Sequence, residues 1–183
     1  MPRCKWATGD LMACYHDDKW GVPLHADCEL FEMLTLEGAQ AGLSWLTILK
    51  RQDMYRQAFD NFDPRKVSKY TQKDISRLLK DEGIIRNKLK IHSAIRNAKK
   101  FLEIQKEFGS FDKYIWSFVN YTPIVNRPKR QSDVPVSTGL SDKISADLTR
   151  RGFNFVGTTI CYAFMQAIGI VNDHTRDCFK CEK

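Results

Sequence analysis

Apolar residues recur at helical spacing through most of the chain. From Asp27 onward, Leu30, Phe31, Met33 and Leu34 follow the i, i+3, i+4 spacing of a helix that buries one face. Helix-capping residues and the same spacing predict further helices over 45–59, from Asp63-Pro64, over 71–81, 87–107, 111–119, 141–151 and 158–168. Because no segment shows a useful length of strand alternation, the chain is predicted to be all-α, with about eight to ten short helices.

Two stretches lack a sustained period. The first 26 residues contain Pro2, Gly9, Gly21 and Pro23, so they are expected to be mostly irregular and held in place by something other than their own secondary structure. Residues 120–139 contain three prolines and are expected to form a surface loop. The length and the hydrophobic content predict one domain over residues 1–183, with room for two closely packed helical lobes.

Composition narrows the class of protein. The first residues do not form a signal peptide and no apolar run reaches membrane-spanning length, so we expect a cytoplasmic protein without membrane contact. In that reducing compartment the six cysteines are expected to be metal ligands or buried thiols. A net charge of +7, with basic clusters at 88–100 and 127–130, favours a polyanion such as nucleic acid, although such clusters also occur as solvated helix faces.

One carboxylate stands on an apolar helix face. Glu37 continues the face that begins at Leu30, and it is followed by the small residues Gly38, Ala39, Ala41 and Gly42. Ser44 is positioned to cap a new helix that begins at Trp45. A small-residue turn between an acid and an indole suits a pocket for a flat, polar, π-rich ligand. The alternative is that Glu37 turns off the helix seam into water.

A second feature is the turn at 151–159, where Gly152 and Gly157 flank an apolar segment that ends at Thr158 and Thr159. Such a turn can direct backbone N–H groups at a phosphate beside a helix N-terminus. The alternative is a Schellman cap at Gly152 followed by an ordinary connector.

A third feature comprises cysteines and histidines at both ends of the chain. His174 and Cys178 are four residues apart, so one helical turn places them together, and Cys4 with His16 would complete a tetrahedral site. Four protein ligands leave no open position, so a zinc ion there would be structural and would join the chain ends. The alternatives are idle buried thiols, or a redox or metal role for the Cys178-x-x-Cys181 pair.

The aromatic residues Trp6, Tyr15, Trp20 and Trp45 form the last feature. A zinc site would bring the N-terminal aromatics over the helix that carries Glu37. Aromatic residues in this position are either ordinary core or a surface on which a base stacks.

Taken together, these motifs resemble the bacterial DNA-3-methyladenine glycosylase I family, of the helix-hairpin-helix DNA glycosylase superfamily. The resemblance extends in order from Cys4 to Cys178. The motifs are Cys4-x-Trp6, Tyr15-His16-Asp17-x-x-Trp20-Gly21-Val22-Pro23, Leu30-Phe31-Glu32, Leu36-Glu37-Gly38, Gln40-Ala41-Gly42-Leu43-Ser44-Trp45, Trp116-Ser117-Phe118-Val119-Asn120, Phe153-x-Phe155-Val156-Gly157-Thr158-Thr159 and Val171-Asn172-Asp173-His174.

The resemblance implies a helix-hairpin-helix bundle and a monofunctional enzyme that releases 3-methyladenine from alkylated double-stranded DNA. Separately, a chain of this length needs no partner to complete its core, so a monomer is expected. The resemblance implies Glu37 as the catalytic carboxylate, which hydrogen-bonds the flipped base together with Tyr15, while a share of Glu37 in activating water stays open. It further implies Trp45 and Trp6 as stacking walls, with Trp20 beside them, Gly42-Leu43 as the wedge in the duplex, and Gly152, Gly157, Thr158 and Thr159 as the phosphate-binding hairpin. Zn²⁺ would be held by Cys4, His16, His174 and Cys178.

Two positions depart from the wider pattern. Many members of the superfamily place a catalytic aspartate after the hairpin, but here that neighbourhood includes the zinc ligand His174, so Asp173 is not assigned the role. Met12 stands where relatives have a tyrosine near the pocket, and the loop there is one residue shorter.

The chemistry also follows from the substrate. Alkylation at N3 makes adenine cationic, so the base leaves as a neutral molecule without protonation, and an acid among aromatic faces suits such a cation. No lysine is singled out as a nucleophile, so strand cleavage is not expected. The alternatives are a zinc-containing module that binds distorted DNA without chemistry, and a glycosylase for oxidised or mismatched bases.

Overall fold

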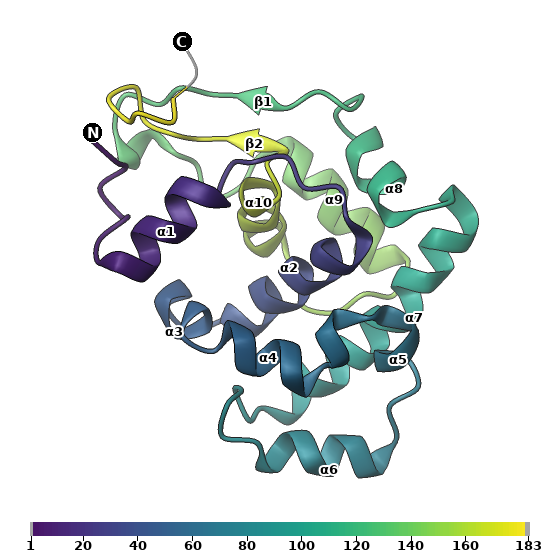
Figure 1. Ribbon diagram of the computed structural model, residues 1–183. Helices are drawn as coiled ribbons and strands as arrows, with labels where there is room; N and C mark the ends of the chain where they lie inside the picture. Colours follow the sequence, from purple (N-terminus) through teal and green to yellow (C-terminus); the bar gives the residue numbers. More distant parts are fainter. Residues whose placement is uncertain (1, 182–183) are drawn as a thin grey trace.

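The centre of the fold is a helix that is buried on all sides. The computed structural model describes residues 2–181, and within it α2 (Asp27–Gln40) packs against both α7 (Lys88–Phe108) and α10 (Thr158–Ala167) (Figure 1). All ten residues from Leu30 to Ala39 are buried. A helix enclosed in this way cannot turn one of its side chains into bulk water, which decides the environment of Glu37.

The other elements surround α2. The remaining α-helices are α1 (Asp10–Asp18), α3 (Trp45–Leu49), α4 (Gln52–Ala58), α5 (Pro64–Val67), α6 (Gln72–Lys80), α8 (Phe111–Ser117) and α9 (Gly139–Arg150). Two short 3₁₀ segments, η1 (Asp60–Phe62) and η2 (Gln131–Asp133), and two strands, β1 (Ile124–Val125) and β2 (Val171–Asn172), complete the secondary structure of residues 2–181. The all-α prediction is confirmed as far as a mainly helical fold, and the two short strands depart from it.

Side-chain caps fix several predicted helix starts. The Asp63 carboxylate accepts a hydrogen bond from the Arg65 N–H at 2.9 Å, with Pro64 in the first turn of α5. Thr71 and Asp74 form a capping box at α6, and the Asn87 side chain accepts from the Lys90 N–H at 3.1 Å to begin α7. These boundaries confirm the prediction, because the capping signal is local in sequence.

The N-terminal region corrects the prediction of an irregular segment. Residues 10–18 form α1, which buries Tyr15 and His16, although its N-cap residue Gly9 has no side-chain cap. The helix predicted over 45–59 is also two helices, because the chain leaves helical geometry at Arg51, where φ is −113° and ψ is 0°. In both places tertiary packing decides the structure where the local pattern is weak.

Residues 120–139 are the second correction. β1 pairs in parallel with β2, with Ile124 opposite Val171, whereas no strand was predicted. Each strand has only two residues, too few for alternation to be visible in the sequence. The helix predicted from Ser141 begins two residues earlier, with Thr138 as the N-cap and Ser141 as the third residue of its capping box.

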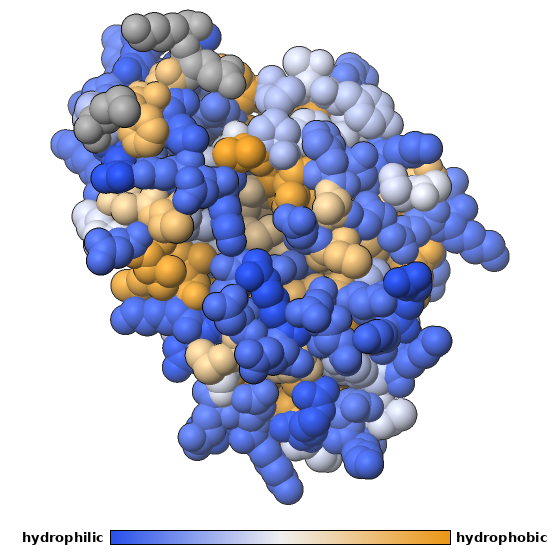
Figure 2. All heavy atoms as spheres, in the orientation of Figure 1, coloured by the Kyte–Doolittle hydropathy of each residue, from blue (hydrophilic) through white to orange (hydrophobic). Residues whose placement is uncertain are grey.

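The two ends of the described chain lie side by side. The Phe179 N–H donates a hydrogen bond to the Pro2 carbonyl at 2.9 Å, and both segments lie in the upper left of Figure 1. Figure 2 shows hydrophilic side chains over most of one face, with smaller apolar areas between them. Among residues 2–181, no helix is long and apolar enough to cross a membrane.

Candidate active site and metal centre

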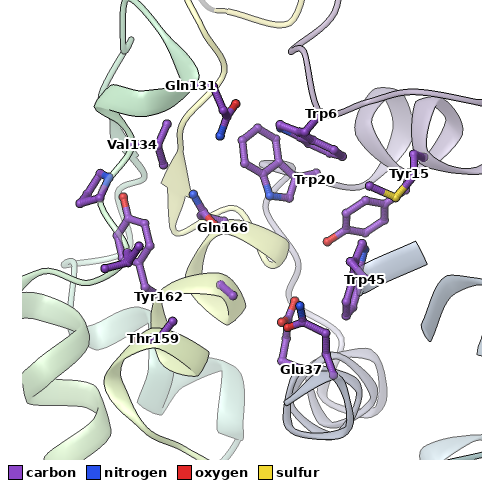
Figure 3. A pocket seen from close by; sticks show the side chains of 15 residues that line it. Trp6, Tyr15, Trp20, Glu37, Trp45, Gln131, Val134, Thr159, Tyr162 and Gln166 are labelled. Carbon is purple, nitrogen blue, oxygen red and sulfur yellow. The ribbon is translucent and has the colours of Figure 1, made fainter. Parts of the chain in front are cut away.

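A pocket of about 410 Å³ lies between α2 and α10 and is lined by residues from both halves of the chain (Figure 3). Its volume falls within the range of small-molecule sites. The residues that line it are Trp6, Met12, Tyr15, Trp20, Glu37, Gln40, Trp45, Gln131, Val134, Pro135, Val136, Thr159, Tyr162, Ala163 and Gln166. The structure therefore brings Glu37 and all four predicted aromatic residues to one pocket.

Glu37 is the acid of this pocket. Its residue is 4% exposed, so the alternative in which it turns into water is wrong. None of the described residues hydrogen-bonds to its carboxylate, and burial raises its pKa from 4.5 to about 8. A carboxylate left without a protein donor in such a position is poised to meet a cationic or hydrogen-bond-donating ligand.

Aromatic rings stand next to this acid. Tyr15 and Trp45 have ring centroids 5.3 Å apart, and Trp6 lies 5.0 Å from Trp20 in an edge-on arrangement. Burial and the nearby Glu37 raise the pKa of the Tyr15 phenol well above 10, so this group is an O–H donor at neutral pH. The Trp45 indole Nε1 is buried and has no partner among the described residues. The pocket thus combines stacking surfaces with donors and one acid.

The opposite wall contains residues that the sequence reasoning missed. Tyr162 and Gln166 are four residues apart on α10, and both donate to Asp173 Oδ2, at 2.6 and 2.7 Å. Asn126 donates to Asp173 Oδ1 at 2.7 Å, so this 1% exposed aspartate is already an acceptor for three donors. The i, i+4 spacing of Tyr162 and Gln166 was the available signal. No sequence signal pointed to Gln131, since it lies in the region predicted as a surface loop.

Two further predicted residues are at the turn after α2. Gly42 has a φ of +78° with open space around it, and Leu43 is 38% exposed on the turn between α2 and α3. The turn is closed by a hydrogen bond from the Leu43 N–H to the Gln40 carbonyl at 2.7 Å. An exposed apolar tip on a tight turn has the shape required of a wedge.

The turn between α9 and α10 fits both interpretations of it. Gly152 has a φ of +92°, and hydrogen bonds run from its N–H to the Thr149 carbonyl and from the Phe153 N–H to the Leu148 carbonyl, which confirms the Schellman cap. Gly157 is the N-cap of α10 and has no side chain to cap the helix. The helix N-terminus that follows therefore retains backbone N–H donors for an anion.

The two threonines of this turn have different surroundings. The Thr158 hydroxyl donates to Asp142 Oδ1 at 2.6 Å and contacts the Ser141 hydroxyl at 2.8 Å, so it is committed to α9. Thr159 instead lines the pocket. If this turn binds phosphate, the backbone of Thr158 is the available donor.

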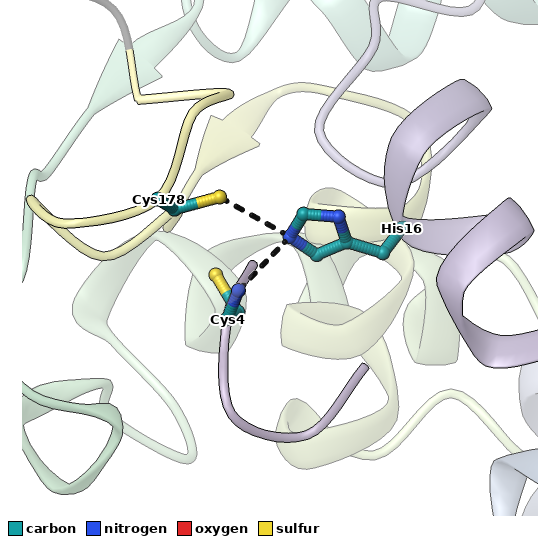
Figure 4. Close-up of side chains that lie close together, drawn as sticks. All are labelled: Cys4, His16 and Cys178. Carbon is teal, nitrogen blue, oxygen red and sulfur yellow. Dashed lines mark hydrogen bonds between the residues drawn. The ribbon is translucent and has the colours of Figure 1, made fainter. Parts of the chain in front are cut away.

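Three of the four predicted metal ligands form one cluster (Figure 4). The ligand atoms of Cys4, His16 and Cys178 lie within 4.8 Å of one another, and Cys178 Sγ is 3.3 Å from His16 Nε2. The Thr175 N–H points at Cys4 Sγ and the Lys180 N–H at Cys178 Sγ, each at 3.4 Å. Such donors suit thiolates, so the residues fit a metal ion.

His174 lies beside this cluster but outside the group of close ligand atoms. Its ring centroid is 4.8 Å from that of His16, and its buried Nε2 has no partner among the described residues. Its Nδ1 contacts Asn172 Oδ1 at 2.8 Å, while the His16 Nδ1 contacts Asp17 Oδ1 at 2.7 Å. Both imidazoles are therefore held at Nδ1, while the His16 Nε2 faces the cysteines of the cluster and the His174 Nε2 has no partner among the described residues. A histidine held at one ring nitrogen with the other directed at a metal site is typical of metal-ligating histidines.

The fold and the site define a mainly helical protein with an acid-containing aromatic pocket for a flat cationic ligand and basic clusters in its sequence. The chain belongs to the methyladenine glycosylase family, whose family model matches residues 6–181. It is 49% identical to DNA-3-methyladenine glycosylase 1 of Escherichia coli over 97% of this chain and 96% of the relative.

Solved structures agree with this assignment. A crystal structure of 3-methyladenine DNA glycosylase I matches with a TM-score of 0.96 and 46% identity, covering 99% of this chain and 100% of that one. A structure of the Staphylococcus aureus 3-methyladenine DNA glycosylase I, described as the basis of 3-methyladenine recognition, matches with a TM-score of 0.95 and 37% identity, covering 99% and 97% of the two chains.

Proposed function

We propose that this chain is a monofunctional DNA glycosylase of base-excision repair that flips 3-methyladenine out of alkylated duplex DNA and hydrolyses its bond to deoxyribose. The observation that carries the proposal is the buried Glu37 carboxylate, which has no partner among the described residues and lies in a pocket with Tyr15 and Trp45. Family membership and the named relatives support the same activity.

The substrate explains the design of the pocket. N3-alkylated adenine is a cation in DNA and leaves as a neutral base when the glycosidic electron pair returns to the ring. The enzyme therefore has to bind a cation and shelter the positive charge that develops on the sugar, and needs no acid to protonate the leaving base. Ionised Glu37 attracts that cation directly, while the faces of Trp45 and Trp6 attract it through their π electrons.

The resting acid and the bound acid differ in charge. With a pKa of about 8, Glu37 is mostly protonated at neutral pH before the base enters. An incoming cation favours the ionised form, so its arrival lowers this pKa and the proton leaves to solvent. Neutral adenine offers no such compensation, and this provides discrimination against undamaged DNA. The Tyr15 phenol remains a donor throughout because its pKa is raised.

Outside the pocket, we propose that Gly42 and Leu43 enter the duplex where the base has left, and that Gly152, Gly157, Thr158 and Thr159 form the hairpin that faces the phosphates. Exposed Leu43 and the uncapped α10 N-terminus support these roles. We propose that the chain acts as a monomer in the bacterial cytosol, with alkylated double-stranded DNA as its partner, because one chain supplies the whole pocket.

We also propose that a structural zinc ion is bound by Cys4, His16, His174 and Cys178. The cluster of three ligands and the unpartnered Nε2 of His174 support this ligand set. When bound, the ion would supply a fixed link between residues far apart in the chain, with no open coordination position for chemistry. Metal analysis of freshly purified protein is expected to find one zinc per chain, and a protein without metal would contradict the proposal.

The activity is tested by incubating methylated duplex DNA with wild type, Glu37→Gln and Glu82→Gln, followed by identification of the released bases. Glu82 is a matched control because its side chain is 86% exposed. Wild type and Glu82→Gln are expected to release 3-methyladenine, and Glu37→Gln to release at least about ten-fold less. Binding of damaged DNA without release would favour the non-enzymatic module, and release of a different base would favour a glycosylase for other lesions.

A further inference from the structure

α7 holds the turn that follows α2. The Lys90 ammonium donates to the Ala39 carbonyl at 2.8 Å and to the Ala41 carbonyl at 2.7 Å. These carbonyls belong to the last turn of α2 and to the residue just after it, where helix geometry leaves oxygens without partners. One side chain from a distant helix therefore closes the end of the helix that carries Glu37 and anchors the base of the turn that carries Leu43.

Lys90 lies at a position where its positive charge destabilises its own helix, α7. Lys90 lies in the first turn of α7, where the helix macrodipole is positive and disfavours a cation. Burial also lowers the pKa of Lys90, so its charged form is further penalised there. At the C-terminus of α2 the same charge is favourable. The side chain thus serves the turn after α2 and not the helix to which it belongs.

α7 also holds the hairpin between α9 and α10. The buried Asn97 side chain donates to the Asn154 carbonyl at 2.9 Å and accepts from the Asn154 N–H at 2.8 Å. The Arg96 Nε adds a hydrogen bond to the Gly152 carbonyl at 2.7 Å. The backbone of the hairpin is therefore fixed to α7 by side chains and not only by the helices that flank it.

The two anchors lie on one face of one rigid element. Positions 90 and 97 are seven residues apart, which is two helical turns, so they are separated by about 10 Å along the axis. The 152–157 hairpin also packs directly on α2. A Cβ added at Gly38 of α2 would lie only 3.2 Å from the Phe155 Cβ. Phe155 itself has a φ of +55°, a strained value for a side-chain-bearing residue.

We propose that Lys90 and Asn97 are positioning residues for the glycosylase reaction, which set the spacing between the Leu43 turn and the 152–157 hairpin on α7. This inference rests on the proposed function. According to that function, the Leu43 turn enters the base stack while the 152–157 hairpin contacts the DNA phosphates. Both must therefore contact the same duplex at the same time. Fixing their spacing before DNA arrives removes an ordering cost from the flipping step.

The test compares Lys90→Met with Lys88→Met, which removes the same charge from an exposed position in the same helical turn. Three properties are measured for each: binding of free 3-methyladenine through tryptophan fluorescence, kcat and KM for base release, and fluorescence of 2-aminopurine beside an abasic site in a duplex. The 2-aminopurine signal reports unstacking when the wedge enters. Lys90→Arg tests whether another two-donor cation restores the turn.

Lys90→Met is expected to bind the free base within about two-fold of wild type, since it does not line the pocket. It is expected to lose about ten-fold or more in kcat and most of the 2-aminopurine signal, whereas Lys88→Met changes mainly KM. Lys90→Arg should recover a large part of both losses. Asn97→Asp loses the donor to Asn154 but keeps the acceptor. It is likewise expected to leave free-base binding nearly unchanged and to lower kcat.

Equal behaviour of Lys90→Met and Lys88→Met in kcat and in 2-aminopurine fluorescence would overturn the inference while leaving the glycosylase intact. A general loss of structure in Lys90→Met would lower free-base binding as well and would count against a positioning role. If wild type released no base, the proposed function would fail. The comparison of wedge insertion on the abasic duplex would still decide the role of Lys90.

Discussion

The buried acid makes a quantitative prediction about stability. Glu37 has a pKa of about 8 in the folded protein and a reference value of 4.5. Between these two values the folded state retains a proton that the unfolded state has released. The free energy of unfolding contributed by this group therefore falls as pH rises through this window, and it is level below about pH 4.5 and above about pH 8. The full difference corresponds to about 5 kcal/mol, which sets the upper limit of the effect.

Glu37→Gln removes this titration and keeps the shape of the side chain. Near the low end of the window, wild type and variant are expected to differ only by a constant offset. Near pH 8 the variant should gain several kcal/mol relative to that offset, equivalent to a rise in Tm of about 10 °C for a chain of this length. The predicted variant is thus more stable and less active, as expected when an acid is retained for function.

Urea unfolding of both proteins, followed by tryptophan fluorescence from about pH 5 to about pH 9, measures the difference. The cluster of Cys4, His16 and Cys178 is the same in both proteins, so its contribution cancels. Asp53→Asn, at a side chain that is 88% exposed, controls for the loss of one surface carboxylate and should show no comparable rise across this range. A difference between wild type and Glu37→Gln that stays constant across the range would refute the assignment of a strongly raised pKa to this group.

Three further predictions concern the pocket wall, the metal and the DNA. Trp45→Ala should slow release of 3-methyladenine by about ten-fold to a hundred-fold, because stacking contributes about 1–3 kcal/mol per base, and single-turnover release assays will measure it. Cys178→Ser, or removal of metal by a chelator, should lower the free energy of unfolding by several kcal/mol in denaturant titrations, whereas the exposed Cys14→Ser should have little effect. Affinity for duplex DNA should fall at least about ten-fold between low and physiological salt in binding titrations, and an affinity independent of salt would argue against phosphate contacts.

Local signals explain which parts of the fold were predictable. The starts of α5, α6 and α7 are set by Asp63, Thr71 and Asn87, whose side chains bond to backbone two or three residues away. α1 lacks such a signal: Gly9 cannot cap it, and the residues it buries belong to the pocket and the metal cluster. His16 contacts His174 and Cys178 from the C-terminal end of the chain, and α1 also packs against α3. A local sequence pattern contains none of these tertiary contacts.

The same distinction holds for the site. Glu37 was visible because a carboxylate on an apolar helix face is an anomaly within a few residues of sequence. The pocket wall made by Gln131 and Tyr162 was not recognised in the sequence. A polar residue in a loop is ordinary, and so is a polar residue on a helix of mixed polar and apolar character. The pairing of β1 with β2 connects residues 47 positions apart, from Ile124 to Val171, and only the folded chain brings the loop of Gln131 to the pocket.

Buried polar atoms without partners occur at both proposed sites, the base pocket and the metal cluster. Among the described residues, four buried side-chain atoms have no hydrogen-bond partner, and they belong to Thr35, Trp45, Gln131 and His174. Two of these residues line the base pocket and a third lies beside the metal cluster. Folded proteins satisfy nearly all such atoms, since each one left alone costs about 1–3 kcal/mol. Three of the four lie where ligands are proposed, and Glu37 adds an unpaired acid to the same pocket. At these three positions the fold carries the cost where binding of a ligand can offset it.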